Sequence, residues 1–449
     1  MTASQAPQGA TPHPTPPATA GVGDSPAASP GDGSANAGRT GVLAVVYVIA
    51  YFAMYVALLT PVMSTLALKV EELTPATKEQ SLGLVMGVGA FFAFVANPIA
   101  GALSDRTVSK LGMRRPWLIW GIAGGAAGLA AIALANQLWL VVVGWAVAQG
   151  CCNATQAALQ AILPDQVPER VRAKVSGWLG TAQNVAPLVG IGLAAAFSKA
   201  GLPISWMVIV PAAIGVAGIL ALAAVLKDRH LDPKDRPPFH LWPFVKSFWV
   251  FSRANADFTW AWLGRFFIFL AFASYNTYQL YYLQARFGWE AGQALSWQLR
   301  LMVAQVVALT LAASIGGVIS DRTGKRKIFV IVAAVAAGIG LGLLALAQSP
   351  GLLWVAVSFW GVGFGAYLAV DLALVTDVLP HAETEAAKNM GVFNIANALP
   401  QSLAPAVAPA VLALGATEAV PENYSSLFAV AAVCAIIGAV TTMFIRGAK

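Results

Sequence analysis

Residues 101–107 read Gly-Ala-Leu-Ser-Asp-Arg-Thr, and residues 317–323 read Gly-Val-Ile-Ser-Asp-Arg-Thr. The two heptapeptides differ only at their second and third positions, and each follows a long apolar stretch of the chain. A second pair of landmarks comes later in the same order, with Leu-Pro-Asp at residues 163–165 and Val-Thr-Asp at residues 375–377. Two matched landmarks indicate an internal repeat, so the two halves are expected to fold alike.

The composition indicates that both halves lie in a membrane. Of the 449 residues, 58% are hydrophobic and 10% are charged, whereas an average soluble domain is about 45–50% apolar and about 25% charged. So few charges cannot cover a soluble protein of this size with a polar surface, which excludes an ordinary soluble enzyme and a disordered scaffold. The net charge of +7 does not indicate nucleic-acid binding, because the basic residues form short clusters between apolar stretches.

The alternation of apolar and polar stretches predicts an all-α integral membrane protein. Twelve transmembrane helices are expected to form two pseudo-symmetric six-helix bundles, residues 41–226 and 257–449, joined by a cytoplasmic linker at residues 227–256. Residues 1–40 are rich in Ala, Pro, Gly, Ser and Thr and are predicted to form a disordered cytoplasmic tail. Each apolar stretch reaches roughly the 20 residues that span a bilayer. The predicted spans cover residues 41–68, 81–103, 116–135, 138–163, 175–197, 202–226, 258–284, 297–319, 328–347, 351–379, 391–414 and 424–445.

The distribution of basic residues predicts which side the termini face. With the N-terminus inside, 21 of the 27 Lys and Arg residues fall on the inner side and 4 on the outer side. Arg265 and Arg300 fall within predicted helices. Because Lys and Arg are enriched in cytoplasmic loops, both termini are predicted to be cytoplasmic, in a multi-pass protein of the cell membrane.

The repeated loops carry a resemblance to a known family. In the second copy, Asp321 and Arg322 are followed by Gly-Lys-Arg at residues 324–326. The first copy is stretched by four residues and ends in Arg-Arg-Pro at residues 114–116. Six plus six helices with such loops resemble the major facilitator superfamily, and the longer loop is similar to those of the glycoside–cation symporters and sucrose transporters. The resemblance implies two halves that rock around a central binding site.

The same resemblance implies that the loop residues form a conformational gate. Asp105 is expected to meet the start of the eleventh helix near residues 388–393, and Asp321 the start of the fifth helix near residues 174–178. The positive end of a helix dipole stabilises a carboxylate by about 0.3–1 kcal/mol at exposed sites. The arginines expected to add charge-assisted hydrogen bonds across these loops are Arg106, Arg115, Arg322 and Arg326. The alternative is that the loop charges only follow the preference for positive residues in cytoplasmic loops.

Ionisable residues inside a membrane span are costly, so each is a functional candidate. Asp371 lies six residues before Asp377, or about 9 Å of helix rise, and is the candidate for proton coupling. Arg265 lies about 12 Å into the membrane, and Tyr275 and Asn276 follow it. These residues are expected to contact an anionic or hydroxyl-rich substrate. The alternatives are that Arg265 pairs with Asp371, that Asp371 is structural, and that the aromatic residues form an interface belt.

Uncharged polar residues mark one face of two further helices. Asn153 and Gln156 belong to a series with Gln149 and Gln160 that recurs every three or four residues, so the four side chains share a helix face. Asn394 gives the eleventh predicted helix a comparable face. A polar stripe in a membrane faces a cavity or another helix, so these residues are candidates for the substrate pathway or for helix–helix packing.

The sequence shows no hydrolase, dinucleotide or metal-binding constellation, so no cofactor, metal or enzymatic activity is expected. The function that fits the sequence best is secondary active transport of a small organic solute by alternating access. The resemblance implies a sugar-like solute. Coupling to protons is left open. The first two predicted helices lack the acidic residues that glycoside symporters and sucrose carriers use there. The alternatives are efflux of a drug or metabolite, and a non-transporting membrane assembly or sensor. The expected partners are the solute, the bilayer and a coupling proton, without nucleic acid, for a protein acting as a monomer.

Overall fold

The computed structural model describes residues 30–235, 255–378, 382–417 and 422–446. Packing divides the chain into two units, residues 1–42 and residues 43–449. In the first unit, the backbone is helical from Pro30 onward. The second unit contains all the contacts described below.

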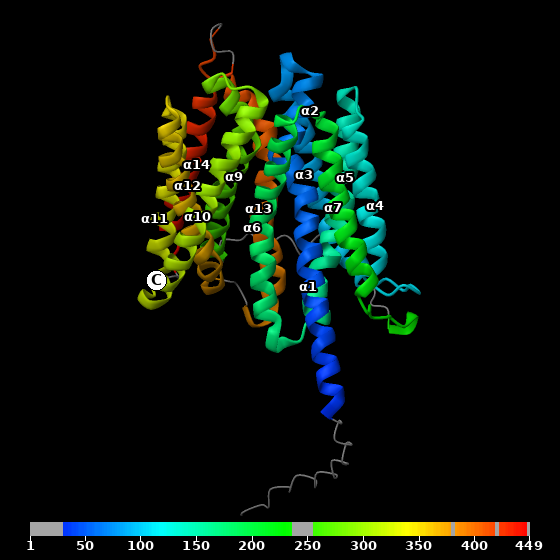
Figure 1. The fold of residues 1–449 in the computed structure, drawn as a ribbon. Coiled ribbons are helices and arrows are strands. Elements are labelled where there is room, and N and C mark those ends of the chain that lie inside the picture. The colour runs from blue at the N-terminus through cyan, green and yellow to red at the C-terminus, as the bar shows by residue number, and fades with distance from the viewer. Residues whose placement is uncertain (1–29, 236–254, 379–381, 418–421, 447–449) are drawn as a thin grey trace, which may run out of the picture. The chain divides into compact units, whose positions relative to one another are not determined.

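Every element of the described residues is a helix, and within them twelve helical segments are long and apolar enough to cross a membrane (Figure 1). The first segment runs from α1 (Pro30–Thr60) through the π-helical turn η1 (Pro61–Thr65) into α2 (Leu66–Leu73). The first half continues with η2 (Pro75–Thr77), α3 (Lys78–Ser104), α4 (Arg115–Ala133), α5 (Leu138–Gln166), α6 (Glu169–Lys199) and α7 (Ile204–Val225), followed by η3 (Pro233–Asp235). The second half contains α9 (Ala256–Phe287), α10 (Ala291–Thr323), α11 (Arg326–Leu346), α12 (Pro350–Asp377), α13 (Ala382–Leu412) and α14 (Tyr424–Met443). The predicted fold class is confirmed.

Most helices begin before the predicted spans: α6, α10 and α13 begin at Glu169, Ala291 and Ala382, where the spans are predicted from residues 175, 297 and 391. The first two spans differ as well. The predicted tail extends to residue 40, but α1 begins at Pro30, and residues 1–29 lie outside the described residues. A formed helix extends more easily than a new one nucleates, so the first span carries the residues before it into the helix. The second span is predicted from residue 81, but α3 begins at Lys78 after a short helical turn at Pro75. Pro75 at the start of η2 and Glu79 at the positive end of the α3 dipole both favour the earlier helical start.

The two halves repeat the same packing (Figure 1). In the first half, α5 packs against α3 and α4, and α4 packs against α7. In the second half, α12 packs against α10 and α11, and α11 packs against α14. Each helix of the second set has the neighbours that its counterpart has in the first. The repeat first seen in residues 101–107 and 317–323 therefore extends to the tertiary structure.

Glycines allow helices within each half to cross closely. A Cβ on Gly128 of α4 would lie 2.5 Å from the carbonyl oxygen of Gly144 in α5. In the second half, a Cβ on Gly363 of α12 would lie 2.3 Å from the backbone nitrogen of Ala337 in α11. Helices in lipid gain no hydrophobic energy by associating, so close backbone contact through small residues stabilises these pairs instead.

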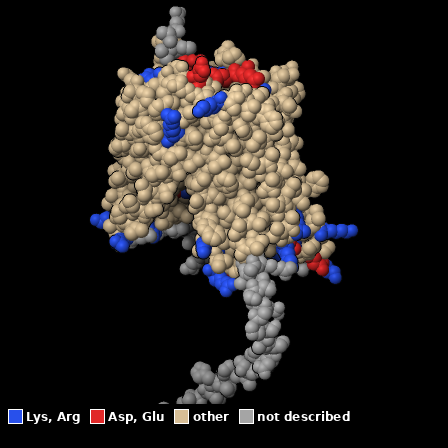
Figure 2. Space-filling view, in the orientation of Figure 1, with Lys and Arg blue, Asp and Glu red and all other residues tan. Residues whose placement is uncertain are grey.

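The two ends of the helices differ in charge. Figure 2 shows Asp and Glu side chains gathered at the top of the view, whereas Lys and Arg are prominent at the bottom. We call the end where α2 leads into α3 the acidic end; it carries Glu71 and Glu72. We call the end where α3 leads into α4 the basic end; it carries Arg106, Arg114 and Arg115.

The two halves meet at the acidic end and separate toward the basic end. Helix α3 packs against α13, where a Cβ on Gly83 would lie 2.5 Å from the carbonyl oxygen of Pro405. Helix α6 packs against α10, where a Cβ on Gly192 would lie 3.8 Å from Leu299. Nearer the basic end, the face of α6 that includes Ser176 is exposed, and the surface is hollowed (Figure 2). The structure is therefore closed at the acidic end and open toward the basic end.

Candidate functional site

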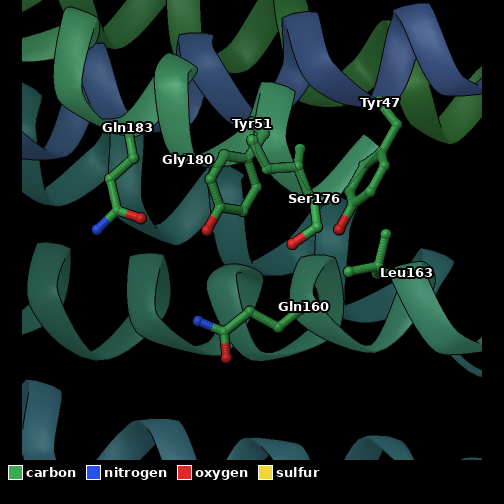
Figure 3. A pocket seen from close by; sticks show the side chains of 8 residues that line it. Tyr47, Tyr51, Gln160, Leu163, Ser176, Gly180 and Gln183 are labelled. Atoms are coloured by element: carbon green, nitrogen blue, oxygen red, sulfur yellow. The ribbon is translucent and has the colours of Figure 1, made fainter. Parts of the chain in front are cut away.

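A cavity of about 270 Å³ lies in the first half between α1, α5 and α6 (Figure 3). Its lining residues are Tyr47, Tyr51, Gln160, Leu163, Ser176, Leu179, Gly180 and Gln183. Figure 3 shows the hydroxyl groups of Tyr47, Tyr51 and Ser176 pointing toward the helix that carries Gln160. Hydroxyl and amide groups from three helices therefore converge on one space.

Tyr47 and Tyr51 of α1 line this cavity, and Tyr55 lies one turn further along the same helix. Tyr47, Tyr51 and Tyr55 are spaced by four residues and share a helix face. The ring centroids of Tyr47 and Tyr51 are 6.2 Å apart, and those of Tyr51 and Tyr55 are 4.9 Å apart. The Tyr47 hydroxyl donates to the carbonyl of Leu159 at 2.7 Å. These tyrosines are absent from the predicted site, although their four-residue spacing in an apolar helix is a signal that could have identified them.

Three polar side chains at the cavity are available to a ligand. Gln160, Ser176 and Gln183 are exposed, and the structure gives them no hydrogen-bond partner among the described residues. Asn184, on the same helix as Ser176, instead donates to the carbonyl of Gly180 at 2.9 Å. None of the residues that line the cavity is charged. The cavity therefore fits a neutral solute that offers hydrogen-bonding groups and an apolar face for the tyrosine rings.

The side chains of the predicted polar stripe on α5 have different roles. Gln160 lines the cavity, and the amide of Gln156 donates to the hydroxyl of Tyr55. Asn153 is buried and donates to the backbone and side-chain oxygens of Gln149, both at 2.9 Å. Gln156 thus binds Tyr55, the neighbour of the cavity residue Tyr51, whereas Asn153 is held within its own helix.

A buried ion pair joins α9 and α12 in the second half. The guanidinium of Arg265 contacts the carboxylate of Asp371, and the two side chains are 11% and 5% exposed. The Tyr367 hydroxyl donates to the other carboxylate oxygen at 2.7 Å. The guanidinium carbon lies 4.9 Å from the ring centroid of Phe269 and 4.5 Å from that of Phe393. The pairing that the sequence left open is therefore present, and aromatic rings cover it.

The other candidates on α9 are held inside the second half. The Tyr275 hydroxyl donates to Gln305 at 3.0 Å and accepts from Gln279 at 2.6 Å. Asn276 donates to the carbonyl of Phe272 in its own helix at 2.8 Å. Both candidates are buried. The Tyr275 hydroxyl and the Asn276 amide nitrogen are thus already engaged within the second half.

Asn394 has a different environment from the candidates on α9. It is exposed on α13 and shares a helix face with Gln401, Pro405 and Pro409. Pro405 and Pro409 pack against Gly83 of α3 at the acidic end. The place of Asn394 on the substrate pathway stays a prediction.

Arg114 links Asp105, in the first repeated loop, to Asp165 of α5 at the basic end. Its guanidinium pairs with Asp105 at 2.6 Å and with Asp165 at 3.0 Å. Asp105 thus binds its own half in this structure. Of the stretch at residues 388–393 that it was expected to meet, the side chains of residues 388–391 lie outside the described residues, and Phe393 packs against Arg265. The predicted contact between Asp105 and the start of α13 stays a prediction for a state closed at the basic end.

The remaining gate candidates are described in part. Arg106 and Arg115 donate to backbone carbonyl groups of the first half, and Arg326 donates to one of the second half. Arg322 is exposed at the end of α10. The side chain of Asp321 lies outside the described residues, so its predicted contact with the start of α6 stays a prediction.

The two halves offer different chemistry: neutral hydrogen-bonding groups in the first, and the buried Arg265–Asp371 pair in the second. The cavity beside Tyr51 offers neutral donors and acceptors, and Asp371 offers a buried carboxylate that pairs with Arg265. Among the residues that the structure describes, no group of His, Cys, Asp and Glu could hold a metal ion. The arrangement suits reversible binding of a neutral solute.

Comparisons with known sequences agree on one family. The model of the Major Facilitator Superfamily matches residues 43–405 and 294–448. A class G tetracycline resistance protein from Vibrio anguillarum is 28% identical over 209 residues, which cover 46% of this chain and 50% of that protein. The chain thus matches about half the length of this relative.

Solved structures of the same architecture extend the match to most of the chain. A variant of the nucleoside transporter NupG is similar with a TM-score of 0.72 at 14% identity, over 90% of this chain and 99% of that chain. A D-xylose-proton symporter is similar with a TM-score of 0.69 at 14% identity, over 91% of this chain and 99% of that chain. At this identity the likeness is one of fold.

Proposed function

The chain belongs to the Major Facilitator Superfamily, and we propose that it transports a small neutral solute rich in hydroxyl groups, as a sugar is. The cavity of the first half carries this proposal. Gln160, Ser176 and Gln183 offer unengaged polar groups there beside the ring of Tyr51, and no lining residue is charged. Polyhydroxylated solutes offer both the hydrogen-bonding groups and the flat apolar faces that such a site binds.

The proposed mechanism is alternating access by rocking of the two halves. Contacts between the halves at the acidic end and the hollow toward the basic end support assigning the structure to one of the two access states. In the other state, Asp105 and Asp321 would meet the starts of α13 and α6 and close the basic end. In this structure, the ion pairs of Arg114 with Asp105 and Asp165 hold the loop that carries Asp105 in place. From this position, Asp105 would contact α13 when the basic end closes.

We assign proton coupling to Asp371. Both residues belong to the second half, so the proposed step is a movement of α9 against α12 that accompanies rocking and separates Arg265 from Asp371. The carboxylate is then left without its cation among apolar residues, which is costly. A proton taken up by the carboxylate removes that charge, and its release allows Arg265 to pair again. Proton transfer is thereby linked to the conformational step.

The basic end is proposed to face the cytoplasm of a cell membrane, with both termini on that side, because Lys and Arg are enriched in cytoplasmic loops. Two bundles, residues 41–226 and 257–449, would then be joined by a cytoplasmic linker at residues 227–256. Residues 236–254 of this linker lie outside the described residues. The protein is proposed to act as a monomer, because each half supplies its own part of the site.

Uptake into proteoliposomes tests the transport proposal. A panel of neutral sugars and nucleosides is compared with charged solutes, with and without a pH gradient. Gln160→Leu removes one hydrogen bond to the solute, about 0.5–1.5 kcal/mol, so KM is expected to rise about two- to tenfold. Thr181→Val is the matched control, because its hydroxyl bonds the carbonyl of Gly177 in its own helix. Uptake of charged solutes only, or equal KM in both variants, would contradict the proposal.

Efflux of a drug is the second candidate function, and the relative named as a tetracycline resistance protein favours it. Tetracycline also presents hydroxyl groups and flat rings, so the same cavity would bind it. Cells that express the protein should then accumulate less tetracycline than cells that express Gln160→Leu. Equal accumulation, together with uptake of neutral solutes by proteoliposomes, would exclude efflux.

A further inference from the structure

Glu79 is a second buried carboxylic acid, at the opposite end of the molecule from Asp371. It lies in the first turn of α3 at the acidic end and is 2% exposed. Its carboxylate accepts a hydrogen bond from the Tyr424 hydroxyl of α14 at 2.8 Å. Its backbone carbonyl accepts from the Tyr278 hydroxyl of α9 at 3.3 Å. Glu79 belongs to the first half and both donors belong to the second, so these bonds cross the closed end.

Glu79 has no direct ion pair among the described residues. Lys78, the adjacent residue, instead binds Glu71 at 2.7 Å and lies 4.8 Å from the ring centroid of Tyr281. The titratable and charged groups that face Glu79 are Lys78 of α3, Tyr278 and Tyr281 of α9, Tyr424 of α14, and Glu422 before it. Glu71 of α2 faces Tyr281 and binds Lys78. The described side chains of α13 include no titratable group.

Closure of the acidic end therefore depends on the protonation of Glu79. When the halves close, Glu79 leaves water for a site that offers hydroxyl donors and no free cation. An ionised carboxylate is costly in such a site, whereas a neutral acid with a hydrogen-bond partner is tolerated. When the halves open, Glu79 returns to water and the ionised form is stable there.

We infer that Glu79 is a proton-binding site that makes closure of the acidic end respond to the pH on that side. A proton from that compartment binds the carboxylate as the halves close and returns to the same compartment as they open. The proton is not carried across the membrane, which distinguishes this site from Asp371. The inference rests on the proposed alternation of the halves, but on no particular solute and no coupling ion.

Distance measurements between labels at the acidic end test this inference. Ala76→Cys in η2 and Leu414→Cys after α13 provide exposed label sites, in a full-length chain whose Cys151, Cys152 and Cys434 are replaced by alanine. Electron paramagnetic resonance in lipid nanodiscs then gives the ratio of closed to open populations across a pH series without added solute. One proton per closure predicts that this ratio falls by up to about tenfold per pH unit as the pH rises.

Variants of Glu79 and a nearby carboxylate identify the group. Glu79→Gln is expected to stay closed at every pH, whereas Glu79→Asp keeps the pH dependence. Glu72→Gln is the matched control, because Glu72 is an exposed carboxylate at the same end, paired with Lys69. A wild-type pH profile in Glu79→Gln, or loss of the profile in Glu72→Gln, would overturn the inference.

A second experiment changes the pH on one side of the membrane at a time and uses the protein with Glu79 intact. It tests the inference even if Glu79→Gln does not fold. In proteoliposomes with one protein orientation, the pH is changed on the acidic-end side alone and then on the basic-end side alone. The populations at the acidic end are expected to respond to the first change and not to the second. No response to the first change would overturn the inference. Because no solute is present, a failure of solute transport bears on the proposed function and leaves this result intact.

Discussion

Neutralising one member of the Arg265–Asp371 pair is expected to destabilise the protein far more than the pair as a whole stabilises it. The two side chains are 11% and 5% exposed, so either charge alone would remain buried without compensation. Removing one partner of a buried pair costs about 3–5 kcal/mol, and Asp371→Asn and Arg265→Gln are each expected in that range. The double variant leaves no buried charge, so its loss should fall short of the sum of the single losses by up to about 3 kcal/mol.

Two further variants calibrate this prediction. Tyr367→Phe removes the donor at 2.7 Å from Asp371 and leaves the ion pair in place. A hydrogen bond to a charged group contributes about 1.5–3 kcal/mol, so this variant should lose less than either charge variant. Arg300→Gln is the control, because Arg300 is exposed and lies over the Trp297 ring, 5.4 Å from its centroid. A cation–π contact at an exposed site contributes about 0.5–1 kcal/mol.

Denaturant titration in detergent, followed by tryptophan fluorescence, gives the free energy of unfolding of each protein. Losses in Asp371→Asn and Arg265→Gln no larger than in Arg300→Gln would refute the reasoning. Losses that simply add in the double variant would refute it as well. Transport tests the coupling role separately: if the double variant folds and still accumulates solute along a pH gradient, Asp371 is not the coupling group.

Two other predictions concern the closed end and the first loop. A Cβ on Gly83 would lie 2.5 Å from a backbone oxygen of α13, so Gly83→Ala should force α3 and α13 apart and increase cysteine labelling at the acidic end. Gly87→Ala, where the nearest contact is 3.6 Å, should label like the wild type, and equal labelling of the two variants would contradict this reading. Asp228 accepts hydrogen bonds from the backbone N–H groups of Arg114 and Arg115 at 2.6 and 2.8 Å, so Asp228→Ala should lower the free energy of unfolding by about 0.5–2 kcal/mol. An unchanged unfolding midpoint would show that this cap does not stabilise α4.

The fold could be predicted well because a bilayer imposes a simple rule on sequence. A span needs about 20 apolar residues, and the matched heptapeptides at residues 101–107 and 317–323 aligned the two halves. The boundaries at Pro30 and Lys78 were less predictable. Polar residues at the end of a helix carry no hydropathy signal, and their helical state depends on capping and on the adjoining span.

The candidate site could be predicted only in part. Gln160 of the polar stripe lines the cavity, but Asn153 and Asn276 bond within their own helices. Tyr47 and Tyr51 did not stand out, because tyrosine is common both in membrane interfaces and in helix packing. In a membrane both the lipid face and the packed face of a helix are apolar, so hydropathy does not identify the face that meets a cavity.

The sequence by itself determined the twelve spans, the repeat and the charge difference between the two ends, because these depend on local composition and on position along the chain. The tertiary structure alone decided which polar groups meet. Arg265 and Asp371 are 106 residues apart and pair only because α9 packs near α12. Glu79 is buried only because the second half closes over it. Such contacts depend on which helix faces which, and that arrangement follows from the packing of all the helices together.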